Sequence, residues 1–251
     1  MKKWLIIGAS RGMGAALASY AAERGVSLVL AAAADSMAEL DTQLAEIRSR
    51  SSAQVGAVTL DMTAEPAVIL KAMQEAEAVL GGLDCIWING GIIGHQTLDT
   101  LDVALERRII EVNLSGVIAC IHAAVALFDG RDGHIAVSSS IAAVMPFAHA
   151  PAYGASKAAV STYCENIRKR LKRRKISLTL LHPGFIRTDM VQAFGHQVCP
   201  LLMSSKERAV AAIFRALMQR KTSVYIPTLP WLPLMMASRL LPAAWLRRLL
   251  L

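Results

Sequence analysis

The stretch that decides the fold is WLII at Trp4–Ile7, which runs directly into GASRGMG at Gly8–Gly14 and then into an alanine-rich segment. The four apolar residues predict a short buried strand, and the segment after the glycines predicts a helix. Glycines let the backbone turn tightly and approach a pyrophosphate, and the first N–H groups of a helix offer it a positive dipole end. The spacing Gly-x3-Gly-x-Gly differs from the commoner Gly-x-Gly-x-x-Gly, so an ordinary glycine-rich turn remains an alternative. We interpret the turn as a dinucleotide site.

Outward from this turn, short apolar runs alternate with longer helical patterns to about residue 226. This alternation predicts βαβ units wound into a parallel sheet with helices on both faces. We expect strands at Trp4–Ile7, Ser27–Ala31, Val55–Leu60, Cys85–Ile88, His134–Ser138, Ser177–Leu181 and Ser223–Ile226, and helices near residues 12–24, 36–49, 65–80, 99–128, 152–174 and 206–219. The predicted fold class is α/β, a single Rossmann-type doubly wound domain over residues 1–226 with a seven-stranded parallel sheet.

The composition supports one well-packed domain. Of the 251 residues 54% are hydrophobic but only 5% aromatic, which suits parallel strands buried on both faces. The net charge of +8 would attract anions, yet no aromatic-interleaved basic groove indicates nucleic acid. The four cysteines and six histidines show no metal-site spacing, so we expect no metal. The glycine turn interrupts the apolar start too early for a signal peptide, and we expect a cytoplasmic protein.

The end of the second strand indicates which dinucleotide is preferred. A fold that prefers NAD offers a carboxylate to the adenosine ribose there, but Ala31–Ala34 occupy the place and Asp35 comes slightly late. Arg11, with Ser10 beside it, could instead meet a ribose 2′-phosphate. We therefore favour NADP(H) over NAD(H), although no basic residue follows the strand.

A polar set in the second half of the chain indicates catalysis. Tyr153 and Lys157 are four residues apart, hence on one face of a helix, where an ammonium would favour the phenolate. Ser138–Ser140 end the fifth strand, and ligands bind outside the carboxyl ends of such strands. Asn113, amid apolar residues of the long fourth helix, would be structural if taken alone.

This ordered set resembles the short-chain dehydrogenase/reductase family from about Lys3 to Ile226. The resemblance implies a catalytic tetrad of Asn113, Ser140, Tyr153 and Lys157. Together with the reasoning above, it gives cofactor contacts from Gly8, Ser10, Arg11, Gly12, Met13, Gly14, Asp61, Met62, Asn89, Gly90, Tyr153, Lys157, Pro183, Gly184, Ile186 and Thr188. The sequence departs from the family pattern at Ile7, Ile88 and Gly90, which bear on cofactor packing rather than on the tetrad.

In that family Tyr153 would be the general acid in reduction and the base in oxidation, while Ser140 would polarise the reacting carbonyl. Lys157 would bind the nicotinamide ribose and lower the phenol pKa, and Asn113 would hold a water in a proton relay. The resemblance also implies a homodimer or homotetramer.

Two further segments are open to several interpretations. The basic run from Arg168 to Lys175 is typical of a solvated helix end, or it joins the tail on an anionic membrane. Residues 227–251 form an apolar, proline-punctuated appendage that is too interrupted to span a bilayer. It could make peripheral membrane contact, cap the active site as an apolar wall, or pack between subunits.

We thus predict an NAD(P)(H)-dependent oxidoreductase that transfers a hydride between nicotinamide and a carbonyl or alcohol substrate. We expect this substrate to be hydrophobic. The alternatives are a catalytically silent dinucleotide-sensing protein and a membrane-surface binding protein. A silent protein would usually have lost the tyrosine, the lysine or the serine by substitution. All three residues are present here.

Overall fold

A computed structural model describes residues 2–94, 102–145, 149–188 and 202–238. Seven parallel strands form one sheet in the order β3-β2-β1-β4-β5-β6-β9. The strands are β1 (Lys3–Ile7), β2 (Ser27–Ala32), β3 (Val55–Thr59), β4 (Cys85–Ile88), β5 (Gly133–Ser138), β6 (Ile176–Pro183) and β9 (Ser223–Ile226). The doubly wound parallel sheet predicted from the sequence is confirmed. The order reverses direction beside β1, which places a ligand crevice at the carboxyl ends of β1 and β4.

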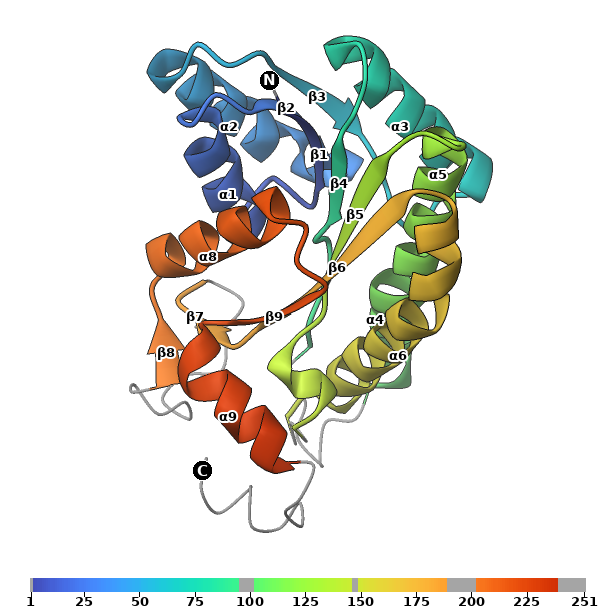
Figure 1. Ribbon diagram of the computed structural model, residues 1–251, viewed down its shortest axis with the longest axis vertical. Helices are drawn as coiled ribbons and strands as arrows, with labels where there is room; N and C mark the ends of the chain where they lie inside the picture. The colour runs from blue at the N-terminus through green and yellow to red at the C-terminus, as the bar shows by residue number, and fades with distance from the viewer. Residues whose placement is uncertain (1, 95–101, 146–148, 189–201, 239–251) are drawn as a thin grey trace.

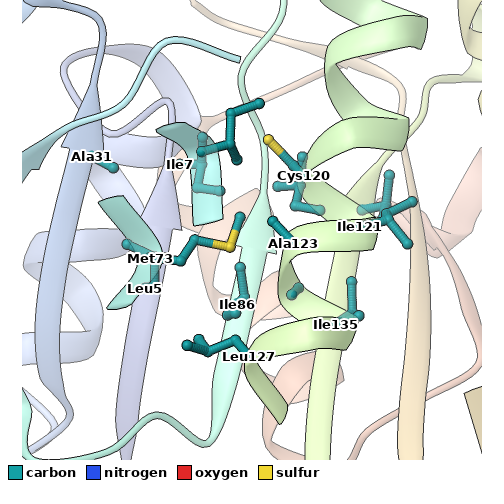
Figure 2. Close-up of a cluster of buried hydrophobic side chains, with 14 of the residues drawn as sticks. Leu5, Ile7, Ala31, Met73, Ile86, Cys120, Ile121, Ala123, Leu127 and Ile135 are labelled. Carbon is teal, nitrogen blue, oxygen red and sulfur yellow. The ribbon is translucent and has the colours of Figure 1, made fainter. Parts of the chain in front are cut away.

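Helices cover both faces of this sheet (Figure 1). One face carries α1 (Gly12–Ala22), α2 (Met37–Arg50) and α8 (Lys206–Met218), and the other carries α3 (Pro66–Leu80), α5 (Val117–Phe128) and α6 (Pro151–Arg173). Each face has its own cluster of buried side chains, because the central strands are apolar on both sides. Figure 2 shows part of the second cluster, where Met73 of α3 and Cys120 of α5 pack over Leu5 and Ile86 of the sheet.

The fourth predicted helix, near residues 99–128, is one continuous rod with a change of winding in its middle. It consists of α4 (Val103–Ile110), the π-helical segment η3 (Glu111–Gly116) and α5. The Asp102 carboxylate caps its start by accepting from the backbone N–H groups of Ala104 and Leu105. Val103–Phe128 is also the one described stretch long and apolar enough to cross a membrane. Its inner face packs in the core of this fold, which explains its apolar character.

The smaller elements were not predicted from the sequence. Two 3₁₀ turns, η1 (Ala34–Ser36) and η4 (Ile141–Ala143), follow β2 and β5. A two-stranded sheet pairs β7 (Phe185–Ile186) with β8 (Met203–Ser204). Beyond β9, the described part of the predicted appendage is α9 (Thr228–Ser238), whose Trp231 is fully buried; residues 239–251 lie outside the described residues.

The basic run and α9 lie at opposite ends of the sheet. The run ends α6 and leads into the first residue of β6, whereas α9 follows the carboxyl end of β9, which is parallel to β6. Arg168 is also bound to the Glu165 carboxylate and to the Leu178 carbonyl. The described part of the tail therefore does not lie beside the basic run, and membrane contact stays a prediction.

Candidate active site

The glycine turn after β1 is held tightly against the sheet. The backbone N–H groups of Gly8 and Ala9 both donate to the Ala31 carbonyl at the end of β2, at 2.9 and 3.1 Å. Gly8 has φ +79°, and a Cβ there would lie 2.6 Å from the backbone of Gly90. A Cβ on Gly14 would lie 2.0 Å from the Gly8 carbonyl oxygen. Only glycine fits at these positions, so the turn follows from its sequence.

The same turn leaves room and free donors for an anion. Gly12 has φ +63°, and a Cβ built on it would meet nothing within 4 Å. Arg11 stands at the N-cap of α1 without a side-chain cap bond, and the first turn of the helix holds no acidic residue. The first N–H groups of α1 therefore carry the positive dipole end without a side-chain cap, which fits a pyrophosphate. Ser10 is half-buried beside Arg11, and Met13 packs against the buried cluster on this face.

A chain of side-chain hydrogen bonds links this turn to the end of β5. The Trp87 indole N–H donates to the Ser138 hydroxyl at 3.0 Å, and that hydroxyl donates to Asn89 Oδ1 at 2.9 Å. Asn89 Nδ2 then donates to the Gly8 carbonyl at 3.3 Å. These bonds join β4, β5 and the glycine turn, so they fix the position of the glycine turn relative to the end of β5.

Lys157 is anchored to the same strand end. Its Nζ donates to the Ser138 carbonyl at 3.0 Å, and the side chain is 3% exposed. The Ser139 hydroxyl donates to the Lys157 backbone carbonyl at 3.1 Å, and the Ser161 hydroxyl donates to it at 2.9 Å. Burial disfavours the ammonium and lowers the pKa of Lys157 to about 8.

Tyr153 lies one turn before Lys157 on α6 and shares a side-chain hydrogen bond with Ser140. The Lys157 ammonium is 5.6 Å from the centre of the Tyr153 ring. Burial raises the pKa of Tyr153, while the hydrogen bond with Ser140 opposes the rise. The Ser140 hydroxyl also accepts from the Ala142 N–H at 3.1 Å, which holds it at the start of η4. The structure thus brings the phenol, the serine and the ammonium together.

Asn113 is fully buried in η3, and its amide is committed to the backbone that follows β4. Its Oδ1 accepts from the Ile92 N–H and its Nδ2 donates to the Ile92 carbonyl, both at 2.8 Å, with a further 3.3 Å contact to the Ser156 hydroxyl. Gly91 separates Asn113 from Lys157, because a Cβ there would lie 3.1 Å from Asn113 Oδ1 and 3.4 Å from Lys157 Nζ. The amide therefore fixes the loop beside Lys157.

The expected adenosine end lies beside β2 and β3. The exposed Asp61 carboxylate accepts from the N–H and the hydroxyl of Thr63, both at 2.8 Å, and the backbone bond lowers the pKa of Asp61. The buried Met62 packs so closely on Gly90 that a Cβ there would lie 2.5 Å from its sulfur. Asp35 is exposed in η1 and accepts from the Ser36 hydroxyl at 3.0 Å.

The expected nicotinamide end follows β6. Pro183 ends this strand, and the Gly184 N–H donates to the Ile226 carbonyl at 2.8 Å. Ile186 is buried in β7, and the Thr188 N–H donates back to its carbonyl at 2.7 Å. This end thus lies at the carboxyl edge of β6, next to β5, the strand that leads to Ser140.

Sequence reasoning missed several residues that organise the site. Four of them are Trp87, Ile92, Ser156 and Ser161. They act through contacts between distant parts of the chain, for which the sequence carries no local signal. The acceptor for Lys157 is the backbone carbonyl of Ser138. Since every residue has such a carbonyl, the sequence carries no signal for it. Among the described residues, no group of three or more potential metal ligands is present.

Comparisons with known proteins agree with this geometry. The family model described as short chain dehydrogenase matches residues 2–198. An uncharacterized oxidoreductase of Mycobacterium tuberculosis is 31% identical over 251 residues, covering 98% of this chain and 96% of its own. The 3-oxoacyl-acyl-carrier-protein reductase of Escherichia coli is 30% identical over 192 residues, or 76% of each chain. A short-chain type dehydrogenase/reductase from Mycobacterium marinum superposes with a TM-score of 0.79 at 24% identity, covering 89% of this chain and 93% of its own.

Proposed function

Since this chain belongs to the short-chain dehydrogenase family, we propose that it is an NADP(H)-preferring oxidoreductase that interconverts hydrophobic carbonyl compounds and alcohols. Family membership makes it a nucleotide-dependent oxidoreductase. The observation that carries the proposed carbonyl chemistry is the buried Lys157 ammonium, held by the Ser138 carbonyl beside the Tyr153 and Ser140 pair. A silent nucleotide-sensing protein would need no such arrangement.

In this proposal each polar group has one task. Tyr153 donates its proton to the carbonyl oxygen in reduction and accepts it back in oxidation. The Ser140 hydroxyl, fixed by the Ala142 N–H, donates to the same oxygen and polarises the carbonyl. The Lys157 ammonium, 5.6 Å from the centre of the Tyr153 ring, would favour the phenolate over the phenol. The hydrogen bond with Ser140 opposes the effect of burial on the pKa of Tyr153. Asn113 positions the Gly91–Ile92 backbone against Lys157.

The residues of the glycine turn would hold the dinucleotide. The first N–H groups of α1 would bind its pyrophosphate, with Gly8, Gly12 and Gly14 leaving the backbone accessible. Lys157 would bind the nicotinamide ribose, and the Pro183–Thr188 segment would lie against the nicotinamide. When bound, the nicotinamide supplies or accepts the hydride.

The preference for NADP(H) rests on Arg11. Its guanidinium is exposed and makes no ion pair among the described residues, while the end of β2 offers only alanines. The first carboxylate after the end of β2 is Asp35. It lies in η1 and accepts a hydrogen bond from the Ser36 hydroxyl. A ribose 2′-phosphate would pair with Arg11 better than two hydroxyl groups would.

A panel of ketones and aldehydes assayed by NADPH and NADH consumption tests the proposal. We expect reduction of apolar ketones with a higher kcat/KM for NADPH than for NADH. No consumption of either cofactor with any compound would contradict the enzymatic proposal and favour the sensing alternative. Equal or better use of NADH would contradict the NADP(H) preference alone.

Peripheral membrane contact is a second proposal. Leu229, Leu232 and Met236 near or on α9 are 72%, 39% and 65% exposed, although large apolar side chains are costly to leave in water. Sedimentation with anionic liposomes tests it. Loss of binding in a variant with serine at these three positions would support the contact, and absence of binding by the unmodified chain would contradict it.

The remaining expectations stay proposals as well. Residues 1–226 would form the oxidoreductase domain with 227–251 as its appendage, working in the cytoplasm as a homodimer or homotetramer. Sedimentation velocity at micromolar protein concentration would test the oligomer, since a monomer alone would contradict it.

A further inference from the structure

Trp231 of α9 packs beside the candidate active site, at the carboxyl end of the sheet. Trp231 is fully buried and forms a cluster with Ile141 and Met145, which follow Ser140 within five residues. Phe185 meets the indole edge-on, with 5.6 Å between ring centroids. The buried apolar cluster that follows Ser140 in the chain therefore includes this indole, which lies behind Ile141 and Phe185.

Gly184 provides the space that the indole fills. A Cβ built on Gly184 would lie 2.1 Å from Trp231 Nε1 and 2.5 Å from Trp231 Cε2. Gly184 belongs to the segment expected to lie against the nicotinamide, so the indole stands directly behind that segment. Figure 1 shows the corresponding arrangement of α9 across the carboxyl ends of β6 and β9.

Hydrogen bonding by the indole Nε1 does not explain why a tryptophan occupies this position. Buried indole N–H groups usually find a hydrogen-bond partner, but Trp231 Nε1 has none among the described residues. Leaving the donor unpaired costs free energy that a phenylalanine would not lose. What tryptophan offers over phenylalanine at this place is the size of its ring.

We propose that Trp231 is a specificity-determining residue, an indole wall that limits how far an apolar substrate extends from its carbonyl past Ile141 and Phe185. The inference rests on the proposed function, because it requires a carbonyl compound at Ser140. Trp231 lies beyond residues 2–198, the part that the family model matches.

Two ketones of different size and the variants Trp231→Phe and Trp231→Leu test the wall. The measured quantity is kcat/KM with NADPH for bulky decalone divided by that for cyclohexanone. We expect the ratio to rise in the order Trp, Phe, Leu, by about tenfold or more for Leu, since each methylene-sized change in a pocket alters selectivity by roughly tenfold or more. Leu232→Ala, an exposed position on the same helix, is the matched control and should leave the ratio unchanged.

Binding provides a readout that does not depend on turnover. Calorimetric titration of decalone into each protein saturated with NADP⁺ should show tighter binding in the same order, while the Kd for NADPH stays within twofold. If Trp231→Leu does not fold, Trp231→Phe decides alone with the smaller rise.

The outcomes separate the two claims. An active unmodified chain whose ratio stays within twofold in the folded Trp231 variants would overturn the wall and leave the proposed function standing. No NADPH consumption with any ketone would overturn the proposed function. The calorimetric comparison would then decide about the wall, and equal decalone affinities would overturn it.

Discussion

Lys157 Nζ donates a 3.0 Å hydrogen bond to the backbone carbonyl of Ser138, two residues before the candidate catalytic Ser140. The bond ties the cation on α6 to the strand end that carries the serine, so both groups keep one geometry relative to Tyr153. The Ser138 hydroxyl is bound in turn to Trp87 and Asn89, and Asn89 to the glycine turn. One connected network therefore links Lys157, the strand end that leads to Ser140 and the expected pyrophosphate site.

The pH dependence of reduction should report the charge of Lys157. Burial lowers its pKa to about 8, so the ammonium is present below that pH and is lost above it. We expect kcat/KM for NADPH, which reflects the cofactor-free protein, to be constant near pH 6–7 and to fall as the pH rises through about 8. A profile of initial rates in overlapping buffers checks this. In Lys157→Arg the guanidinium keeps its charge, so any residual activity should lack that decline. A wild-type decline only above about pH 10 would contradict the assignment.

Gly91→Ala should impair catalysis more than folding. The added Cβ would lie 3.1 Å from Asn113 Oδ1, so the Asn113 amide must shift by a few tenths of an ångström, and it would stand in contact with Lys157 Nζ at 3.4 Å. We expect kcat to fall by about tenfold or more, because small misplacements of catalytic groups are costly.

Gly56→Ala is the matched control for this substitution. Gly56 lies on β3, and its Cβ would lie 2.7 Å from a methyl group of Val79 on α3. The substitution should therefore lower the thermal midpoint while sparing kcat. Steady-state rates and thermal melts of both variants check the contrast. Wild-type kcat in Gly91→Ala would show that the Asn113–Lys157 spacing has no bearing on the reaction.

Arg11→Gln should remove the preference for NADP(H). The loss of the guanidinium should raise KM for NADPH by about tenfold, since charge-assisted bonds to phosphate are worth roughly 1.5–3 kcal/mol, and should leave KM for NADH unchanged. Arg50→Gln, an exposed arginine paired with Glu46 at the end of α2, controls for net charge. Equal changes in KM for both cofactors would mean that Arg11 does not read the 2′-phosphate.

The sequence predicted the parts of this protein that depend on local patterns. All seven strands of the main sheet lie within two residues of their predicted bounds, because each is a short apolar run between helical patterns. The glycine turn was also readable, since φ +79° at Gly8 and the close approach of Gly14 permit no side chain.

What the sequence could not predict depends on contacts between distant residues. The π-helical winding at Asn113 accompanies its bonds to Ile92, 21 residues away. The acceptor for Lys157 is a backbone carbonyl, which has no residue type to recognise. The sequence left three roles possible for residues 227–251. It could not show that Trp231 is buried, because the space for the indole is created by Gly184 in another part of the chain. The two-residue strands β7 and β8 are too short to carry a pattern.

The central claim is that Tyr153 exchanges the proton with the substrate beside a bound nicotinamide. Single-turnover oxidation of NADPH by an apolar ketone in Tyr153→Phe, with NADPH affinity measured by fluorescence titration, tests it most directly. Tyr163→Phe on the same helix, whose hydroxyl lies 2.9 Å from His122 Nε2, is the matched control. We expect Tyr153→Phe to lose at least about 100-fold in rate while its Kd for NADPH stays within threefold, and Tyr163→Phe to match the unmodified chain. A rate in Tyr153→Phe close to that of the unmodified chain would contradict the account.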